Sequence, residues 1–210
     1  MPQPQTSDPD RAERSVAPDL RLRRRIRMKN LLQSEALALF AARGYHQTSI
    51  DDIAHAAAIS PRTFYRYYAC KEDVVLWDEY DELPPGELWD AHAGEDAFTL
   101  MVRRLRELTA QLYSQDRARL LARTKLSYAV PEIRARFVSQ QVDMIGPYYL
   151  QLTDALGVPS DDLHLAVTMA AALSAVLVAM EHWQRHDDEE ELPHLLDEAI
   201  AALTSITPRR

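Results

Sequence analysis

Apolar residues recur every three or four positions along most of the chain, and this spacing predicts helices rather than strands. Leu32, Ala36, Leu39 and Phe40 share one face of the first long segment, and Gly44 follows as a helix C-cap. Strand-type alternation is scarce, and Ala, Leu, Arg and Glu dominate the composition. The pattern therefore predicts an all-α fold.

Two short helices come next, each with its own start signal. Ser49 and Asp52 have the spacing of a capping box, and Ser60 with Pro61 forms an N-cap followed by proline at the first helical position. The second short helix is expected to end near Tyr68. Two short helices joined by the residues AAIS, the second one basic, fit a helix-turn-helix.

The remaining periodic segments complete a nine-helix architecture. They are expected at 71–83, 95–113, 116–129, 132–156, 161–185 and 192–206. The sequence divides into a disordered, proline-containing leader (1–19), a helix-turn-helix domain (20–71) and an effector-binding and dimerisation domain (72–210). Gly146-Pro147 should kink the segment that contains it.

Charge separates these regions sharply. The whole chain of 210 residues carries a net charge of −8. Residues 11–71 hold 12 Lys and Arg against 5 Asp and Glu, a balance of +7, whereas residues 72–96 hold ten acidic residues and no basic one. A basic region attached to an acidic one is typical of a protein that binds a polyanion, because steering depends on the local field.

Composition also narrows the class of protein. A single cysteine excludes an internal disulfide and suits a reducing compartment, so we expect a cytoplasmic protein. The apolar run 163–180 contains polar residues and has acidic flanks, which favours a buried helix over a membrane span. Glycine-rich phosphate loops, H-E-x-x-H and nucleophile elbows are missing, so no enzyme activity, cofactor or metal is expected.

The stretch ALALFAARGYHQTSIDDIAHAAAISPRTFYRYYACKEDVV resembles the DNA-binding region of the tetracycline-repressor-like (TetR) family. The resemblance spans about 45 residues, with its features in order. It implies an all-helical body that dimerises and holds an effector. The segments SPRTFYRYY and KEDVVLWDEYDELPPGE resemble the sequences of one branch of this family, the regulators with an acyl-CoA-like ligand-binding C-terminal domain. The function expected is a ligand-released repressor that binds an inverted-repeat operator on double-stranded DNA as a homodimer.

The residues of the second short helix carry the expected base contacts. Arg62, Thr63 and Arg66 project from one side with Tyr67 beside them, and Arg and Thr suit guanine and thymine edges. The resemblance further implies phosphate contacts at Thr48, Tyr65 and Lys71. The full predicted DNA-binding set is Thr48, Ser60, Arg62, Thr63, Tyr65, Arg66, Tyr67 and Lys71. Phe64 and Tyr68 are expected in the core.

Two positions depart from the family pattern. The family usually has glycine in the turn where Ala58 stands, so this alanine either adopts a left-handed conformation at about 1 kcal/mol or the turn is built differently. The family also often has glycine at the position of Arg62, so the base preference of relatives does not transfer.

Large apolar side chains of the second domain are candidates for lining the effector pocket. The predicted ligand-binding residues are Leu105, Leu108, Tyr128, Phe137, Met144, Tyr148, Met169 and Leu173. The effector expected is small and apolar or acyl-CoA-like. The seven basic residues between Arg103 and Lys125 either receive the phosphates of an anionic effector or simply solvate the surface.

The last two apolar segments are expected to mediate assembly, and three further features allow more than one hypothesis. The segment 161–185 is apolar nearly all round, and 192–206 carries a stripe of Leu195, Leu196, Ala199, Ile200 and Leu203, so both are expected to form a four-helix bundle with a second chain. His182 and His186 have metal-ligand spacing or merely end a helix. Cys70 is an oxidant sensor or a cap in place of serine. A helical adaptor without DNA specificity is the alternative to a regulator.

Overall fold

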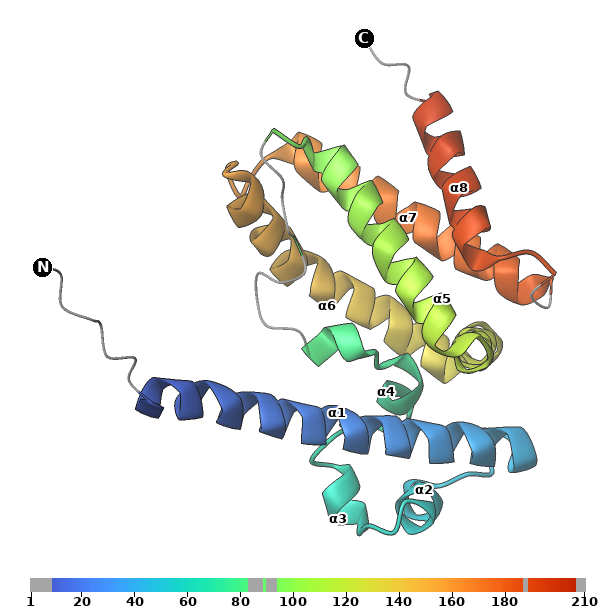
Figure 1. Cartoon of the computed structure of the whole chain (residues 1–210). Coiled ribbons are helices and arrows are strands. Elements are labelled where there is room, and N and C mark those ends of the chain that lie inside the picture. Colours follow the sequence, from blue (N-terminus) through green and yellow to red (C-terminus); the bar gives the residue numbers. More distant parts are fainter. Residues whose placement is uncertain (1–8, 83–88, 90–93, 187–188, 207–210) are drawn as a thin grey trace, which may run out of the picture. The chain divides into compact units, whose positions relative to one another are not determined.

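The computed structural model describes residues 9–82, 89, 94–186 and 189–206, and every regular element in these ranges is a helix. The side chains of residues 9–19, 80, 141–145, 147 and 206 lie outside this description. The elements are α1 (Pro9–Arg43), α2 (Ile50–Ala56), α3 (Pro61–Phe64), α4 (Lys71–Leu76), the 3₁₀ helix η1 (Glu79–Glu82), α5 (Ala97–Ala129), α6 (Pro131–Leu156), α7 (Leu163–Arg185) and α8 (Leu192–Ile206) (Figure 1). The all-α prediction is confirmed.

The chain divides into an N-terminal unit, Met1–Val74, and a C-terminal unit, Val75–Arg210. The sequence placed this division after residue 71, inside what is now α4. Helix α1 begins at Pro9, so residues 9–19 are helical where the sequence predicted a disordered leader, while residues 1–8 lie outside the described residues. Proline is tolerated in the first turn of a helix, and the Ala, Glu and Arg residues after Pro9 favour helix.

The N-terminal unit is built around the predicted face of α1. Leu32, Ala36 and Phe40 are buried, and α2 and α3 add Ile53 and Phe64 to the same interior. Helix α2 packs against both α1 and α3. The small core is sufficient to hold α3, which has only four residues and no independent stability at that length.

In the C-terminal unit, α5 packs against α6, α7 and α8. Its backbone leaves helical geometry at Asp116 (φ −159°, ψ 80°), so α5 consists of two helical parts. The break predicted after residue 113 is therefore real. Counting these two parts separately, the described residues form nine α-helices, as the sequence predicted, and a short 3₁₀ helix.

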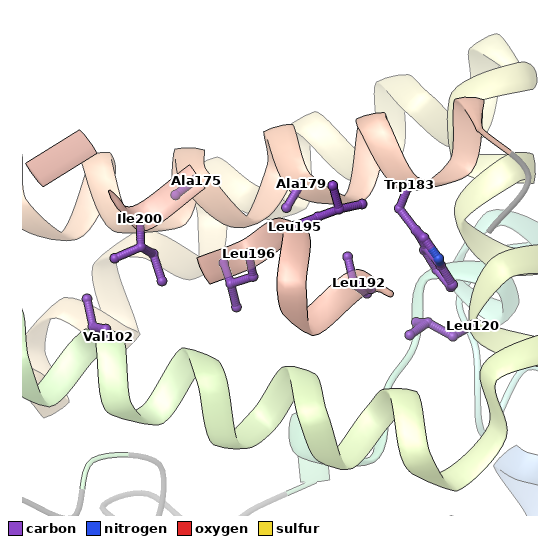
Figure 2. Packing of buried hydrophobic residues seen from close by; sticks show 9 residues of the cluster. All are labelled: Val102, Leu120, Ala175, Ala179, Trp183, Leu192, Leu195, Leu196 and Ile200. Carbon is purple, nitrogen blue, oxygen red and sulfur yellow. The ribbon is translucent and has the colours of Figure 1, made fainter. Parts of the chain in front are cut away.

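A buried cluster joins the long helices of the C-terminal unit. Figure 2 shows Val102 and Leu120 of α5, Ala175, Ala179 and Trp183 of α7, and four α8 side chains converging on one interior. The α8 members are Leu192, Leu195, Leu196 and Ile200. Three of these belong to the stripe that the sequence assigned to a second chain, and that assignment is wrong for them, because their own chain already buries them.

The segment between the two units also differs from its prediction. Helix α4 ends at Leu76 and η1 follows, where the sequence predicted one helix over 71–83. Arg123 of α5 donates from Nε to the carbonyl of Val75 (2.8 Å) and from Nη2 to that of Leu76 (3.2 Å), and its Nη1 pairs with Asp78 (3.0 Å). A guanidinium that caps the last carbonyls of a helix stabilises its end at that point.

Helix α7 is the most apolar element. In the described ranges it is the one helix long and apolar enough to cross a membrane by length and composition, a test that core helices of soluble proteins also pass. Its inward face packs on α5 and α8. Leu163, Val167 and Val178 lie on another side and are 77%, 59% and 60% exposed, so the helix presents an uncovered apolar face.

Candidate functional site

The turn before α2 and the start of α2 are fixed by local hydrogen bonds. Ser49 Oγ accepts from the backbone N–H of Asp52 (3.1 Å), and the Asp52 carboxylate accepts from the backbone N–H of Ser49 (2.9 Å), which confirms the predicted capping box. The hydrogen bond from the Ser49 side chain is the main reason that the pKa of Asp52 lies below its usual value. The lowered pKa means that the carboxylate stays ionised, and keeps capping the helix N-terminus, to lower pH than an ordinary aspartate would.

Ala58 makes the turn between α2 and α3 in a left-handed conformation, with φ at 54°. Its N–H donates to the carbonyl of His55 (3.0 Å), and the next N–H, from Ile59, donates to Ala54 (2.9 Å). Of the two possibilities for this turn, the structure shows the left-handed alanine. Alanine tolerates the strain because the neighbouring hydrogen bonds fix the conformation.

Helix α3 starts as predicted, with Ser60 Oγ accepting from the N–H of Thr63 (3.1 Å) and Pro61 in the first turn. It ends earlier than expected, at Phe64, and a turn follows at residues 65–67. Phe64 and Tyr68 are buried, as predicted, and the Tyr68 hydroxyl donates to the Lys29 carbonyl of α1 (3.1 Å). These two aromatic side chains fix the segment to the core and leave its other side outward.

Six of the eight predicted DNA-binding residues belong to this outward side. Ser60, Arg62, Tyr65 and Arg66 are exposed, and Thr63 and Tyr67 are partly exposed. Arg62 lies in α3 and Arg66 in the turn that follows it, so both guanidinium groups come from one short exposed segment. The segment can therefore offer several hydrogen-bond donors to one partner at a time.

The other two predicted residues have internal roles. Thr48 is 1% exposed, and its hydroxyl donates to the Gly44 carbonyl (3.0 Å). Lys71 Nζ donates to the carbonyls of Tyr45 (2.8 Å) and Thr48 (2.9 Å) and lies 3.9 Å from the Tyr45 ring centroid. The phosphate role implied for the Thr48 side chain does not fit this geometry, and Lys71 has two donors engaged by the turn.

A basic hollow lies beside the outward side of the α3 segment. It has a volume of about 240 Å³ and is lined by Arg21, Arg24 and Arg25 of α1 and by Arg66 and Tyr67. The three α1 arginines were missing from the predicted site. The signal that points to them is the run RLRRRIRMK, in which positions 21, 24 and 25 have the spacing of one helical face.

The C-terminal unit contains a small pocket of about 60 Å³. Its apolar lining comes from the end of α4 and from α5, α6 and α7, and polar atoms come from Arg123, Thr124 and Ser127. Tyr128 and Phe137 were both predicted to bind the ligand, and both line it. Burial raises the pKa of the Tyr128 hydroxyl, which donates to the Leu177 carbonyl (3.1 Å).

The other predicted ligand residues do not gather at this pocket. Met169 is buried in a second cluster, and Leu105, Tyr148 and Leu173 pack against that cluster. Leu108 is partly buried on α5. The side chain of Met144 lies outside the described residues. Pocket and core positions carry the same residue types, so the sequence could not separate them.

The arginine-rich stretch of α5 is largely neutralised by ion pairs. Arg103 pairs with Glu95 (2.9 Å) and Glu107 (3.3 Å), and further pairs are Arg104–Glu107 (2.7 Å), Arg106–Asp197 (2.6 Å), Arg119–Asp116 (3.7 Å) and Arg123–Asp78 (3.0 Å). Arg117 lies over the ring of Tyr113. These ion pairs keep the arginines at the protein surface and engage their charges, which favours the interpretation that they solvate the surface over a receptor for phosphates.

Cys70 caps a helix, and the paired histidines stack on each other. The backbone N–H of Asp73 hydrogen-bonds the Cys70 sulfur, and burial raises the pKa of this thiol to about 11. A thiol with that pKa is a poor oxidant sensor, so the cap interpretation holds. The rings of His182 and His186 stack at 4.1 Å, and no group of three or more metal-ligating side chains occurs in the described part of the chain.

Comparison with known proteins gives relatives along the whole chain. Models for the bacterial regulatory proteins of the tetR family and for the MftR C-terminal domain match residues 32–76 and 95–208. The HTH-type transcriptional regulator TcmR of Streptomyces glaucescens is 31% identical over 219 residues, covering 99% of this chain and 95% of TcmR.

Two solved structures share the fold. Thermus thermophilus FadR, a TetR-family transcriptional repressor in complex with lauroyl-CoA, has a TM-score of 0.55 and 22% identity, covering 87% of this chain and 96% of FadR. The fatty acid degradation regulator FadR of Bacillus halodurans has a TM-score of 0.56 and 20% identity, covering 87% and 97%.

The capped helix-turn-helix, with arginines and tyrosines on its outward side, defines a DNA-binding regulator. The adaptor alternative finds no support among the relatives. The chain belongs to the TetR family of bacterial transcriptional regulators, as the sequence resemblance indicated.

Proposed function

We propose that this protein is a dimeric repressor that binds an inverted-repeat operator and leaves it when an apolar effector enters the C-terminal unit. The observation that carries the proposal is the outward side of the α3 segment, where Arg62 and Arg66 are exposed on a helix-turn-helix of an otherwise acidic chain. Its site of action is the cytoplasm, where operator DNA is found.

Base recognition is assigned to the first residues of α3. The N-terminal residues of a recognition helix contact base edges in the major groove, and arginine can donate two hydrogen bonds to guanine. Arg62 is the second residue of α3 and is exposed. Thr63 is only partly exposed, and its hydroxyl hydrogen-bonds Ser60 Oγ (2.9 Å), so its methyl group is the part that remains to meet thymine.

Replacing Arg62 by alanine tests this assignment. The variant should lose about 1–3 kcal/mol of discrimination at one base pair in each half-site, since one bidentate contact disappears. Affinity for random DNA should change little. The measurement is competitive binding of operator duplexes, selected from random DNA by the wild type, that vary one base pair at a time. Equal losses on every duplex would contradict a base-reading role for Arg62.

Dimerisation is supported by the uncovered face of α7. Leu163 and Val167 occupy successive turns of one face, and Val178 extends it three turns further on. A soluble protein rarely leaves such a face open, and a second copy related by a twofold axis would bury it against itself. Two helix-turn-helix units would then meet half-sites about 34–36 Å apart.

The effector is proposed to be apolar because the lining of the pocket is mainly apolar. An acyl chain fits that lining, and an acyl-CoA-like ligand remains within the proposal. The internal pairing of the arginines in α5 makes the acyl chain, rather than the anionic head group, the determinant of binding. A pocket of about 60 Å³ is far below the ~300–1,000 Å³ of typical ligand sites, so binding must widen it.

Widening the pocket provides a route to the DNA-binding unit. Val75 and Leu76 line the pocket and are the last residues of α4, while Arg123 holds their carbonyls. At the other end of the same helix, Lys71 is bonded to the turn before α2. A ligand that displaces the end of α4 therefore favours a state with different operator affinity, which is the differential binding that allostery requires.

A further inference from the structure

The basic hollow defined by Arg21, Arg24, Arg25, Arg66 and Tyr67 is not needed by the fold. Three arginines at positions i, i+3 and i+4 of α1 share a face, and like charges at this spacing destabilise a helix. Arg66 adds a fourth guanidinium from the segment after α3. None of the five residues that line the hollow is acidic.

The chemistry of the lining indicates the kind of group that the hollow accepts. Guanidinium groups match the oxygens of a phosphate in bidentate geometry, and the tyrosine hydroxyl can add a further donor. Arg25 has a further interaction within the protein, so the expected phosphate donors are Arg21, Arg24 and Arg66. Arg66 is also one of the exposed residues of the α3 segment, which joins the hollow to the recognition surface.

We propose that this hollow binds a backbone phosphate of the operator, next to the groove that α3 enters. The proposal rests on the proposed function and extends it by adding Arg21 and Arg24 of α1 to the DNA interface. DNA is favoured over a free anion because one wall of the hollow belongs to the recognition segment. A phosphate contact positions the protein and carries no base preference of its own.

The first test compares Arg24→Ala with Arg27→Ala, which removes the same charge from an exposed α1 position outside the hollow. Operator affinity is measured by fluorescence anisotropy at several salt concentrations. Loss of one phosphate contact should reduce the slope of log K against log salt by about 0.9, which is about an eightfold loss of affinity at 0.1 M salt. Arg27→Ala should change the slope by less than half as much.

The second test removes the charge from the DNA instead. Single methylphosphonate substitutions are placed along the operator, and wild-type affinity should drop at one position in each half-site. Arg24→Ala should lose nothing further at that position, because the contact is already absent, and should respond normally elsewhere. Thermal unfolding of both variants confirms that α1 is intact.

The outcomes separate this proposal from the one on which it rests. Wild-type protein that binds DNA without sequence preference or salt dependence would overturn both. Wild-type protein with a steep salt slope, combined with equal behaviour of Arg24→Ala and Arg27→Ala or additive methylphosphonate effects, would overturn the phosphate hollow alone. Competition by millimolar inorganic phosphate at constant ionic strength that exceeds the effect of chloride would assign the hollow to a free anion instead.

Discussion

Lys71 contacts two backbone carbonyls and the Tyr45 ring, which makes it part of the turn before α2. A Lys71→Ala variant would leave those carbonyls with fewer partners, so a loss of DNA affinity would mix a lost contact with a loosened turn. Arg24 and Arg62 are better probes of the interface, because the contacts that hold the turn do not include them. The nearby Glu72 accepts from the Tyr45 hydroxyl and adds to the same local network.

The left-handed Ala58 predicts a simple stability effect. Ala58→Gly should stabilise the N-terminal unit by up to about 1 kcal/mol, because relief of about 1–2 kcal/mol of backbone strain exceeds the extra entropy of glycine in the unfolded chain. Urea unfolding measures the difference in the free energy of unfolding, provided that the dependence of this free energy on urea concentration is the same in both proteins. The control is Ala38→Gly. Ala38 is exposed to solvent in the middle of α1, and its replacement should lower the free energy of unfolding by about 0.5–1 kcal/mol. A similar loss of stability in both variants would show that the backbone at Ala58 is not strained.

Single residues also show what the sequence could and could not predict. Ser49, Asp52 and Ser60 have caps that depend on neighbours three residues away, and these were predicted correctly. Thr48 and Lys71 depend on contacts between positions 4 to 26 residues apart, so their internal roles were not visible. The same reason explains why Tyr128 could not be separated from Met169 as a pocket residue.

At the scale of elements, helix existence was easier to predict than helix ends. The break in α5 follows from Ser114 and Gln115, whereas the end of α4 at Leu76 depends on Arg123, which lies 47 positions away. The stripe on α8 was recognised as apolar, but periodicity does not say which neighbour covers it. In this chain the neighbours are α5 and α7.

The dimer interface is therefore predicted to lie on the uncovered face of α7. Val178→Glu should convert the dimer into a monomer at micromolar concentration, because it would place two charges in an apolar twofold interface. Light scattering gives the mass. Val138→Glu is the control, since Val138 is similarly exposed (56%) but belongs to α6. A wild-type monomer, or dissociation by both variants alike, would contradict the α7 interface, and wild-type binding to lipid vesicles would assign the face to a membrane.

At the scale of the whole molecule, DNA binding is assigned to the N-terminal unit and effector binding to the C-terminal unit. The largest basic excess, +7, lies in residues 11–71, so DNA is attracted to the N-terminal unit although the chain has a net charge of −8. The pocket lies in the C-terminal unit, and α4 is the covalent connection between them. Operator affinity and effector affinity should therefore be linked by one coupling free energy, typically 1–3 kcal/mol.

The most direct test of this account is titration of acyl ligands into the complex of the protein with a selected operator, followed by anisotropy. Acyl-CoA thioesters and free fatty acids of matched chain length should each lower operator affinity by about five- to 150-fold, and CoA alone should have no effect. Thermal shift on the free protein reports binding independently. Ligands that stabilise the protein but leave operator affinity unchanged would contradict the coupling, and the absence of both effects at every chain length would contradict an acyl effector.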